Sequence, residues 1–492
     1  MFILKNKTMN TFIKSKFLNP MMHQNINLMF QPSKSVLSPL SKADFDILKN
    51  KILGTETTFV RPAPKLSMLN RTEDDLQQDN ILSGMVAEES GNVKLYKTPN
   101  NFMNKLEKPE QSSLVFINGV FAFSGYPYSI ELTPEKLQGL DFDIVTKSRF
   151  FEANEGTVIR VFNANGNWYT ITNKKLDAFC SKWAAKTKTF GCHLAKSIFV
   201  LLNSDHNGDT PDFDDVTVAK EYVNRIWSDS LDPTKRYFFL LKSSNEERIV
   251  CDADAEILNI GIIDENNTLS LDESVKLTDS LKNNTVVVRF PIEYKFSNLD
   301  DLIEKINNID PYKCCGVLAI FKTDFSGANI ENDIEQHIHV KLLNPKYKYL
   351  HSLRGNTPSL RFRLFQLTYL TNREMQLNQV AQPYVEDFKQ LYYPQCEDIS
   401  KVFMSVVEDV FQKYQSKYVK HETVSDQKME KMEQILNIIH NEYLISKKQT
   451  TPQRVSDILH YVEPEKLNQL IREYEYETKI KQQTYTNSKL PQ

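Results

Sequence analysis

Alternating apolar and polar residues predict β-strands through the middle of the chain. The stretch SLVFINGVFAFSGYPYSIEL, from about Leu114, alternates in this way, and Gly119 and Gly125 mark turns within it. Further along, the runs TVIRVF and NWYTIT are rich in β-branched and aromatic residues, and the linker NANG separates them. Asn165-Gly166 in that linker is a strong short-range signal for a β-hairpin. We therefore expect these two runs to pair antiparallel.

Further short apolar runs predict more strands and two helices in the same part of the chain. The strand-like runs are RYFFLLK, RIVC, TVVVRF, GVLAIFK and HIHVKLL. The stretch NLDDLIEKINNID has the spacing of one amphipathic helix. From Lys175 to about Leu202 the pattern also becomes helical, with Phe179, Trp183 and Phe190 among its apolar positions.

Beyond about Ser359 the spacing of apolar residues is helical throughout. One face of EDISKVFMSVVEDVFQKYQ carries Ile399, Phe403, Val406, Val410 and Tyr414. One face of SDQKMEKMEQILNIIHNEYLI carries Met429, Met432, Leu436, Ile439 and Tyr443. Thr451 suits a helix N-cap, and Pro452 suits the first helical position after it. The expected fold class is α+β: antiparallel sheets with helices, followed by an all-helical C-terminal domain.

Composition narrows the function classes without choosing one. The 492 residues are 40 % hydrophobic and 25 % charged, which allows a large core and more than one domain. A formal net charge of -3 gives no global attraction to nucleic acid, so such a site would have to be a local basic patch. No run reaches the roughly 18 apolar residues that span a bilayer, so we expect no membrane insertion.

The six cysteines and the first 43 residues indicate the kind of cellular compartment in which the protein folds. Six cysteines occur without a CxxC pair, which favours free thiols in a reducing compartment and argues against a zinc site, so no bound metal is expected. Residues 1–43 contain lysines but no acidic residue before Asp44, which is typical of a disordered basic arm. A mitochondrial transit peptide is the alternative, although it would prefer Arg and Ser to Lys and Asn.

Several of these segments, in this order, resemble the motifs of one enzyme family. ANEGTVIRVF resembles motif I, K-x-D/E-G followed by a strand; FFLLKSSNEERIV resembles motif III; CCGVLAIF resembles motif IV; and HVKLLNPKYKYLHSLRG resembles motif V. The chain is thus similar to the ATP-dependent RNA ligases of the bacteriophage type-1 branch, within the superfamily of ligases and mRNA capping enzymes. It resembles especially the divergent ligase-like proteins of large DNA viruses. The resemblance covers about Leu114 to Leu367.

The resemblance implies a domain division and a set of binding residues. We expect a basic arm over 1–43, an extension over 44–113, a ligase-like nucleotidyltransferase domain over 114–358, a helical domain over 359–475 and a flexible tail over 476–492. The implied nucleotide-binding residues are Glu155, Gly156, Thr157, Arg248, Gly316 and Lys341. The segment after the motif V strand interleaves basic and aromatic residues, which suits an RNA backbone and stacked bases. Its candidate RNA-binding residues are Lys346, Tyr347, Lys348, Arg354, Arg361 and Arg363. A solvated face with core tyrosines would produce the same pattern.

The chain departs from the family where the chemistry is most demanding. A ligase needs an uncharged lysine to attack the α-phosphate of ATP, and carboxylates to hold Mg²⁺. Here Ala153 stands at the motif I lysine, Leu240 at the motif III glutamate and Cys315 at the motif IV glutamate. His339 replaces the first motif V lysine, whereas Lys341 keeps the second. An alanine cannot form a phosphoramide, so the usual mechanism lacks its nucleophile.

A relocated lysine would restore the nucleophile. Residues equidistant from the NANG turn pair across the hairpin, which would bring Lys174 and Lys175 back beside Glu155. The sequence KLDA, from Lys175, even imitates K-x-D-G. The simpler interpretation is that both lysines start the next helix or lie in solvent, and moving the lysine would not replace the missing carboxylates.

Three functional interpretations therefore stay open. The first is a ligase homologue with a degenerate adenylation site that binds RNA or a nucleotide, such as tRNA or broken RNA ends, in the cytoplasm, a viral factory or a virion. The second is an active ATP-dependent RNA ligase that uses Lys174 or Lys175 with ATP and Mg²⁺. The third is a structural viral protein that reuses the fold. Neither the oligomeric state nor a choice between ATP and GTP follows from the sequence.

Overall fold

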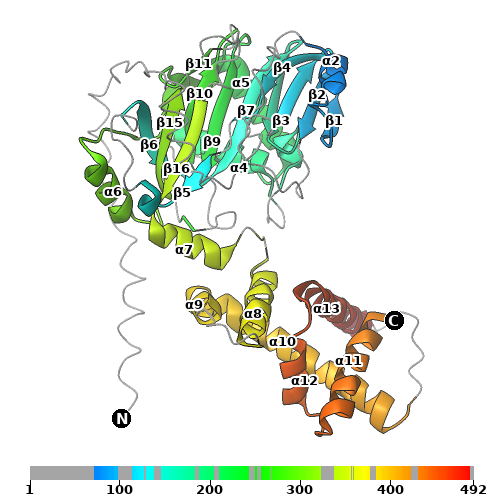
Figure 1. Cartoon of the computed structure of the whole chain (residues 1–492). Helices are drawn as coiled ribbons and strands as arrows, with labels where there is room; N and C mark the ends of the chain where they lie inside the picture. The colour runs from blue at the N-terminus through cyan, green and yellow to red at the C-terminus, as the bar shows by residue number, and fades with distance from the viewer. Residues whose placement is uncertain are drawn as a thin grey trace.

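The computed structural model describes most of the chain beyond residue 70. The described residues are 71–97, 113–126, 129–137, 146–182, 188–203, 210–242, 250–251, 256–265, 268–322, 337–355, 357, 359–376, 384–422 and 430–487. The expected basic arm over 1–43 and the candidate residue Arg248 lie outside these ranges. The fold is α+β with an all-helical C-terminal region, which confirms the expected class. Figure 1 shows the strands gathered in one part of the molecule and the C-terminal helices in another.

Three sheets form the strand-rich part. Sheet 1 has the order β1-β2-β3-β4 and consists of β1 (Val86–Ser90), β2 (Val93–Lys97), β3 (Ser113–Ile117) and β4 (Val120–Ser124). Sheet 2 has the order β11-β10-β9-β7-β8 and consists of β7 (Thr157–Ala164), β8 (Asn167–Thr172), β9 (Arg236–Lys242), β10 (Glu256–Ile263) and β11 (Leu269–Ser270). Sheet 3 has the order β14-β6-β15-β16-β5 and consists of β5 (Ile130–Leu132), β6 (Ser148–Ala153), β14 (Glu293–Tyr294), β15 (Gly316–Lys322) and β16 (His337–Leu343).

Pairing within these sheets is antiparallel except between β16 and β5, which run parallel. A separate hairpin joins β12 (Val275–Asp279) to β13 (Asn284–Val288). Short elements complete this part of the chain: α2 (Glu73–Gln78), and the 3₁₀ turns Pro134–Leu137 and Ala178–Cys180.

The predicted hairpin is confirmed, with its turn at Asn165-Gly166. Both residues have positive φ, 51° and 80°, as a type I′ turn requires. The side-chain oxygen of Asn163 accepts a hydrogen bond from the Gly166 N–H at 3.1 Å. The ladder places Phe162 opposite Tyr169, and their rings stack with centroids 5.3 Å apart.

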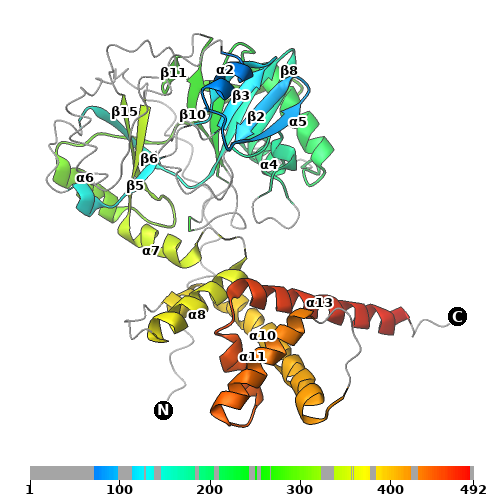
Figure 2. The same ribbon diagram turned by 45° about the vertical axis from the view of Figure 1, so that its right-hand side comes forward.

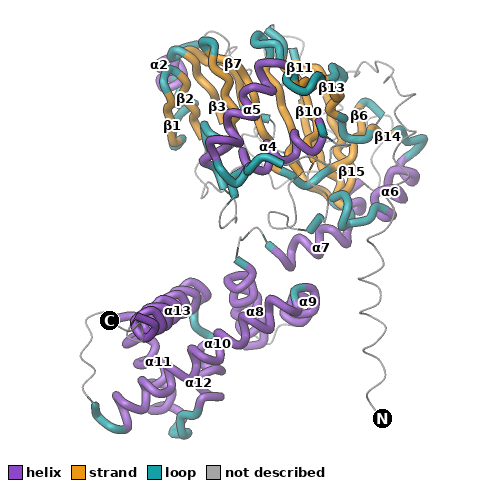
Figure 3. The backbone as a smooth tube through the Cα atoms, turned by 180° about the vertical axis from the view of Figure 1, so that it is seen from behind, coloured by secondary structure: helices purple, strands orange, loops and turns teal. Residues whose placement is uncertain are grey.

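Helices α4 (Phe190–Leu202) and α5 (Val216–Ser230) cover one face of sheet 2, as Figure 3 shows from behind. The buried indole of Trp227 stacks on Phe239 with ring centroids 5.5 Å apart. The predicted helix from Lys175 is wrong at its start: α4 begins at Phe190. Thr189 caps it by accepting a hydrogen bond from the Cys192 N–H, because an unpaired N–H at the first turn needs such an acceptor.

The other face of sheet 2 packs on sheet 1 through aromatic side chains. Phe123 lies edge-on to Phe162 at 5.1 Å and to Phe238 at 6.5 Å. Sheet 3 buries its outer face under α6 (Leu299–Asn308), whose Leu302 and Ile306 are fully buried. The predicted amphipathic helix is therefore confirmed. Figure 2 shows sheets 2 and 3 side by side, with α6 at the far edge.

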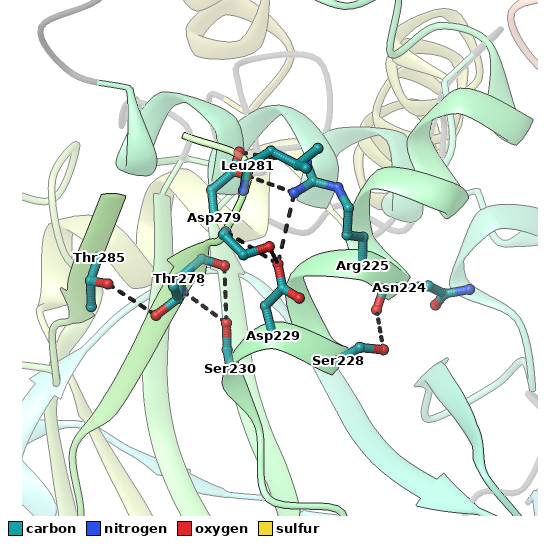
Figure 4. Close-up of polar contacts among 10 residues, drawn as sticks. Asn224, Arg225, Ser228, Asp229, Ser230, Thr278, Asp279, Leu281 and Thr285 are labelled. Carbon is teal, nitrogen blue, oxygen red and sulfur yellow. Dashed lines mark hydrogen bonds and ion pairs between the residues drawn. The ribbon is translucent and has the colours of Figure 1, made fainter. Parts of the chain in front are cut away.

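Polar contacts tie α5 to the β12–β13 hairpin (Figure 4). The Arg225 guanidinium lies 2.6 Å from a carboxylate oxygen of Asp279, which is only 1 % exposed. The Ser230 hydroxyl accepts a hydrogen bond from the Thr278 N–H at 2.8 Å. A buried carboxylate needs such a partner, so this ion pair fixes how the hairpin sits on the helix.

The C-terminal region contains helices and no strand in its described part. They are α7 (Pro345–Arg354), α8 (Leu360–Gln376), α9 (Tyr384–Leu391), α10 (Tyr393–Tyr414), the π-helical turn Gln415–Val419, α11 (Glu430–Ser446), α12 (Pro452–Leu459) and α13 (Pro464–Asn487). The predicted apolar face of α10 is confirmed at Phe403, Val406, Val410 and Tyr414, which are buried.

The predicted face of α11 is buried at Met432, Leu436 and Ile439, whereas Tyr443, which shares their spacing, is 37 % exposed. The chain over 476–487, for which we expect a flexible tail, is helical and belongs to the end of α13. The Thr451 cap is confirmed, since its hydroxyl accepts a hydrogen bond from the Arg454 N–H at 3.2 Å.

Candidate functional site

The motif-like segments approach one another at the ends of β6, β15 and β16 in sheet 3, where Val250, the last residue of the motif III-like segment, binds Glu155. Ala153, at the motif I lysine position, ends β6 and is 1 % exposed. It belongs to a small buried cluster whose other members are Cys251, Cys315, Leu343 and Tyr347. The carbonyl oxygen of Ala153 accepts hydrogen bonds from the Cys315 N–H at 2.8 Å and from the Cys314 thiol at 3.1 Å. The nucleophile position is therefore a methyl group packed among thiols and an aromatic ring.

Glu155, two residues further on, binds the loop that follows motif III. One of its carboxylate oxygens accepts hydrogen bonds from the backbone N–H groups of Val250, at 3.1 Å, and Cys251, at 2.8 Å. These bonds hold Cys251 close to the end of β6, although the two segments are far apart in the sequence. We call Ala153, Glu155, Cys251, Cys315, Lys341 and Tyr347 together the candidate site.

The side chains of Cys251, Cys315 and Tyr347 lie together in this buried cluster. The Cys251 thiol donates a hydrogen bond to the carbonyl oxygen of Pro311 at 3.6 Å. Burial alone would raise the pKa of Cys315, but the neighbouring Cys251 thiol, the charge of Lys341 and the Tyr347 hydroxyl together lower it. The pKa of Cys251 rises because the neighbouring Cys315 and its burial both favour the thiol. Burial also raises the pKa of Tyr347.

Strand β16 supplies the basic side chains of motif V. Lys341 is half-buried, and its Cα neighbours are Leu318 on β15 and Glu131 on β5. His339 lies two residues earlier, on the same face of the strand, and is 1 % exposed. Neither of its ring nitrogens has a hydrogen-bond partner among the described residues. Its ring packs edge-on against Tyr126 at 4.9 Å, and burial lowers its pKa to about 3.

Gly156 and Gly316, the glycines of the motif-like segments, stand where a side chain would collide with neighbouring atoms. At Gly316, which opens β15 with a φ of +155°, an added Cβ would lie 2.0 Å from the carbonyl oxygen of Leu342. At Gly156, it would lie 2.7 Å from the carbonyl oxygen of Leu241 and 2.9 Å from the Leu240 side chain. Thr157 opens β7 and pairs with Leu241 across the ladder. Glycine at both places therefore permits the close strand packing on which the candidate site is built.

The structure does not bring Lys174 and Lys175 together with Glu155. Pairing across the hairpin ends at Ile159 and Thr172, and the Thr172 N–H then closes a turn on the Lys175 carbonyl at 2.9 Å. The Lys175 amine lies 3.6 Å from a carboxylate oxygen of Glu88 on β1. The Lys174 carbonyl accepts a hydrogen bond from the Lys97 amine at 2.8 Å. Both lysines thus lie against sheet 1, because the turn directs the chain away from β6.

The candidate RNA-binding residues divide into those engaged within the chain and those on the surface. Tyr347 is buried in the candidate site. Arg354 is also buried, and its guanidinium donates to the carbonyl oxygen of Thr357. Arg363 donates to the Leu353 carbonyl at 2.8 Å and so joins the end of α7 to α8.

Arg361 forms an ion pair with Glu475 of α13 at 2.8 Å and a hydrogen bond with Asn468 at 3.1 Å. Lys346 and Lys348 are exposed on α7. The Lys346 amine lies 5.9 Å from the centre of the Tyr312 ring. The two lysines are therefore the members of the set whose side chains face solvent.

Sequence reasoning missed a charged network beside Ala153. The Lys242 amine, at the end of β9, lies 3.1 Å from a carboxylate oxygen of Glu256. Arg289 forms an ion pair with the same glutamate and lies 3.7 Å from Glu152, whose carboxylate accepts a hydrogen bond from Asn154. The network connects sheet 2 to the end of β6. The runs RYFFLLK and TVVVRF contain Lys242 and Arg289, but spacing along the chain does not show which distant carboxylates these side chains meet.

The residues present do not fit a bound Mg²⁺ ion. Leu240 and Cys315 replace carboxylates, and one oxygen of Glu155 already accepts two backbone N–H groups. Among the described residues, no group of three or more His, Cys, Asp or Glu side chains is arranged to hold a metal ion. Lys341 does fit a phosphate group, because an ammonium is a good donor to phosphate oxygens.

Within the described ranges, no helix has the length and apolar content needed to cross a bilayer.

Comparison with known proteins gives two viral relatives and several structures. No known family profile matches the chain. The chain is 24 % identical over 442 residues to the immediate-early protein ICP-46 homolog of Invertebrate iridescent virus 6, a match that covers 84 % of this chain and 88 % of the relative. It is 26 % identical over 219 residues to the immediate-early protein ICP-46 of Frog virus 3, covering 44 % of this chain and 49 % of that protein.

Three of the similar structures are described as ATP-dependent ligases. One is described as an ATP-dependent DNA ligase from Aquifex aeolicus, with 10 % identity, a TM-score of 0.31, and coverage of 77 % of this chain and 89 % of that one. Another is an archaeal ATP-dependent RNA ligase, with 9 % identity, a TM-score of 0.31, and coverage of 85 % of this chain and 98 % of that one.

Proposed function

We propose that this chain is an RNA ligase-like viral protein that binds RNA or a nucleotide and does not form a lysyl-AMP. The observation that carries the proposal is the meeting of the four motif-like segments around Ala153. A ligase site has been kept as a scaffold, while the position of its nucleophile holds a methyl group that is 1 % exposed. Without a lysine there, no phosphoramide forms at that position.

Within this proposal, Lys341 is the residue that contacts a phosphate. It keeps the motif V lysine, is half-buried, and acts electrostatically on Cys315 at the centre of the candidate site. Phosphate attracts a cation most strongly where water is partly excluded. Because the residues do not fit Mg²⁺, binding here would depend on this lysine and on backbone donors and not on a bridging metal.

The surface lysines of α7 supply the RNA contact. Lys346 and Lys348 are exposed, and the helix that bears them directly follows β16, which carries Lys341. Cations near a phosphate chain release counterions, which gives binding a measurable salt dependence. The relatives are named as immediate-early proteins of an iridescent virus and a frog virus. These names support the proposal that the protein acts in the infected cell, in the cytoplasm or a viral factory, or in the virion.

Salt-dependent RNA binding tests this function. The affinity of the full chain for a fluorescent single-stranded RNA would be measured at several salt concentrations, together with the double variant Lys346→Gln/Lys348→Gln. The variant is expected to bind less tightly, with a slope of log K against log salt that is smaller by about 1.4, or about 0.7 for each lost contact.

The matched control is Lys401→Gln/Lys466→Gln, which removes two exposed lysines from α10 and α13. It should leave both affinity and slope unchanged. Equal losses of affinity in the two double variants would mean that net charge alone causes the effect. The absence of any RNA binding would favour a structural protein that reuses the fold.

A further inference from the structure

The candidate site contains two thiols that the proposed function does not use. Cys251 and Cys315 are each 2 % exposed and belong to the same small buried cluster. They come from segments that are far apart in the sequence. Two contacts hold them in place: the Cys251 N–H on Glu155 at 2.8 Å, and the Cys315 N–H on Ala153 at 2.8 Å.

The neighbouring thiol of Cys314 is positioned differently. Its sulfur lies 3.1 Å from the carbonyl oxygens of both Ala153 and Gly316, and burial raises its pKa to about 12. Cys314 is therefore held as a protonated donor to the backbone. Cys315, in contrast, lies in the same buried cluster as Cys251 and Tyr347, and the positive charge of Lys341 helps to lower its pKa.

The remaining cysteines have no comparable partner within the described residues. Cys192 lies in the core under sheet 2, Cys396 lies among the C-terminal helices, and Cys180 is exposed. All six cysteines are free. Cys251 and Cys315 thus stand out as two thiols from distant segments that share one small buried cluster.

We propose that the candidate site is a thiol-oxidation site, in which Cys251 and Cys315 form a reversible disulfide when the protein meets a peroxide. The thiolate of Cys315 attacks one peroxide oxygen, so that an S–O bond forms, the O–O bond breaks, and hydroxide leaves and takes up a proton. The Cys251 sulfur then attacks the Cys315 sulfur, the S–S bond forms, and the S–O bond breaks with loss of water. Two thiols and one hydrogen peroxide yield one disulfide and two waters.

The surroundings favour Cys315 as the thiol that reacts first. A thiolate is the reactive form, and a nearby ammonium together with hydrogen-bond donors stabilises it. Lys341, Tyr347 and Cys251 supply these interactions to Cys315. Hydrogen peroxide is small enough to reach a thiol in a buried cluster that bulkier disulfide reagents would not enter. The inference rests on this geometry and does not depend on RNA or nucleotide binding.

The test is peroxide treatment of the reduced, folded full chain at neutral pH. Remaining thiols would be blocked with N-ethylmaleimide, and a non-reducing tryptic digest would be analysed by mass spectrometry. The expected product joins the peptide containing Cys251 to the peptide containing Cys314 and Cys315, and dithiothreitol reverses it. The Cys314→Ser variant should keep the link, and Cys315→Ser should lose it.

Two results would overturn the proposal. One is oxidation of the exposed Cys180 at peroxide levels that leave Cys251 and Cys315 fully reduced. The other is a link that persists in Cys315→Ser and disappears in Cys314→Ser. Fragmentation of the wild-type linked peptide assigns the bonded sulfur independently, so the test does not require either variant to fold.

Discussion

The backbone N–H of Cys315 donates a hydrogen bond to the carbonyl oxygen of Ala153 at 2.8 Å. The contact joins two of the segments on which the resemblance to ligases rests. Neither position carries the reactive side chain expected from that resemblance, because Ala153 has a methyl group and Cys315 a thiol. Under the proposed function, such a site would bind its ligand without adenylation chemistry.

Restoring the lysine alone should not restore adenylation. Ala153→Lys would insert a long charged side chain into a buried cluster and is expected to lower the free energy of unfolding by roughly 2–5 kcal/mol, without label transfer from ATP. Urea denaturation measures the first effect. Ala153→Met is the control, because it adds similar bulk without charge and should cost less. Nucleotide labelling of Ala153→Lys would mean that the missing carboxylates do not matter.

Gly316→Ala should destabilise sheet 3. An added Cβ would lie 2.0 Å from the Leu342 carbonyl oxygen, so the β15–β16 pair would have to separate. We expect a loss of roughly 2–5 kcal/mol in the free energy of unfolding, measured by chemical denaturation. At Gly119, which also has positive φ, nothing lies within 4 Å, so Gly119→Ala should cost only about 1–2 kcal/mol. Equal losses of stability in Gly316→Ala and Gly119→Ala would show that the backbone conformation, and not the contact with Leu342, determines the cost of the substitution.

His339 should make the protein less stable in mild acid. Burial lowers its folded-state pKa to about 3, well below the unfolded value of about 6.5. Below pH 6.5 the unfolded chain therefore binds a proton that the folded chain does not, and its contribution to stability is progressively lost as the pH falls toward 3. The contribution changes by about 1.4 kcal/mol per pH unit in this window.

Comparing wild type with His339→Phe isolates this contribution. Phenylalanine keeps a ring against Tyr126 and has no titrating group. Denaturation at a series of pH values should give a steeper loss of stability below pH 6.5 in the wild type than in the variant. Parallel curves would indicate that His339 is protonated in the folded protein and has a partner.

Asp279→Asn should weaken the junction between α5 and the β12–β13 hairpin. Asp279 is 1 % exposed and lies 2.6 Å from Arg225, so the substitution removes a charged hydrogen bond at a buried site. The expected loss is roughly 1.5–3 kcal/mol in the free energy of unfolding. Lys401→Gln breaks an exposed ion pair with Asp398 and should change stability by no more than about 0.5 kcal/mol. A similar small change at Asp279 would contradict the role given to its ion pair.

Local chemistry explains which elements the sequence could predict. Asn165-Gly166 identified its hairpin because few other residues adopt the required positive φ, and Phe403 and Val406 marked a helix face through their spacing alone. The 37 % exposure of Tyr443 could not be predicted, because spacing shows which residues share a face and not how far along the helix that face is covered.

The candidate site was only partly predictable. The order of the motif-like segments indicated Ala153, Glu155, Cys315 and Lys341, and the structure brings these residues together. The contact between Cys251 and Cys315 could not be predicted, because it depends on how Glu155 binds the backbone of a distant loop. Similarly, the turn at Thr172 that carries Lys175 to Glu88 is a tertiary feature that hairpin register does not predict.

The most direct test of the central claim is incubation of the purified full chain with α-³²P-ATP, and separately with labelled GTP, in the presence of Mg²⁺ or Mn²⁺. A denaturing gel would follow, with acid treatment of any labelled band. The account predicts no covalent label with either nucleotide in a folded sample. An acid-labile label that is lost in Lys174→Ala, Lys175→Ala or Lys341→Ala would contradict it and identify a relocated nucleophile.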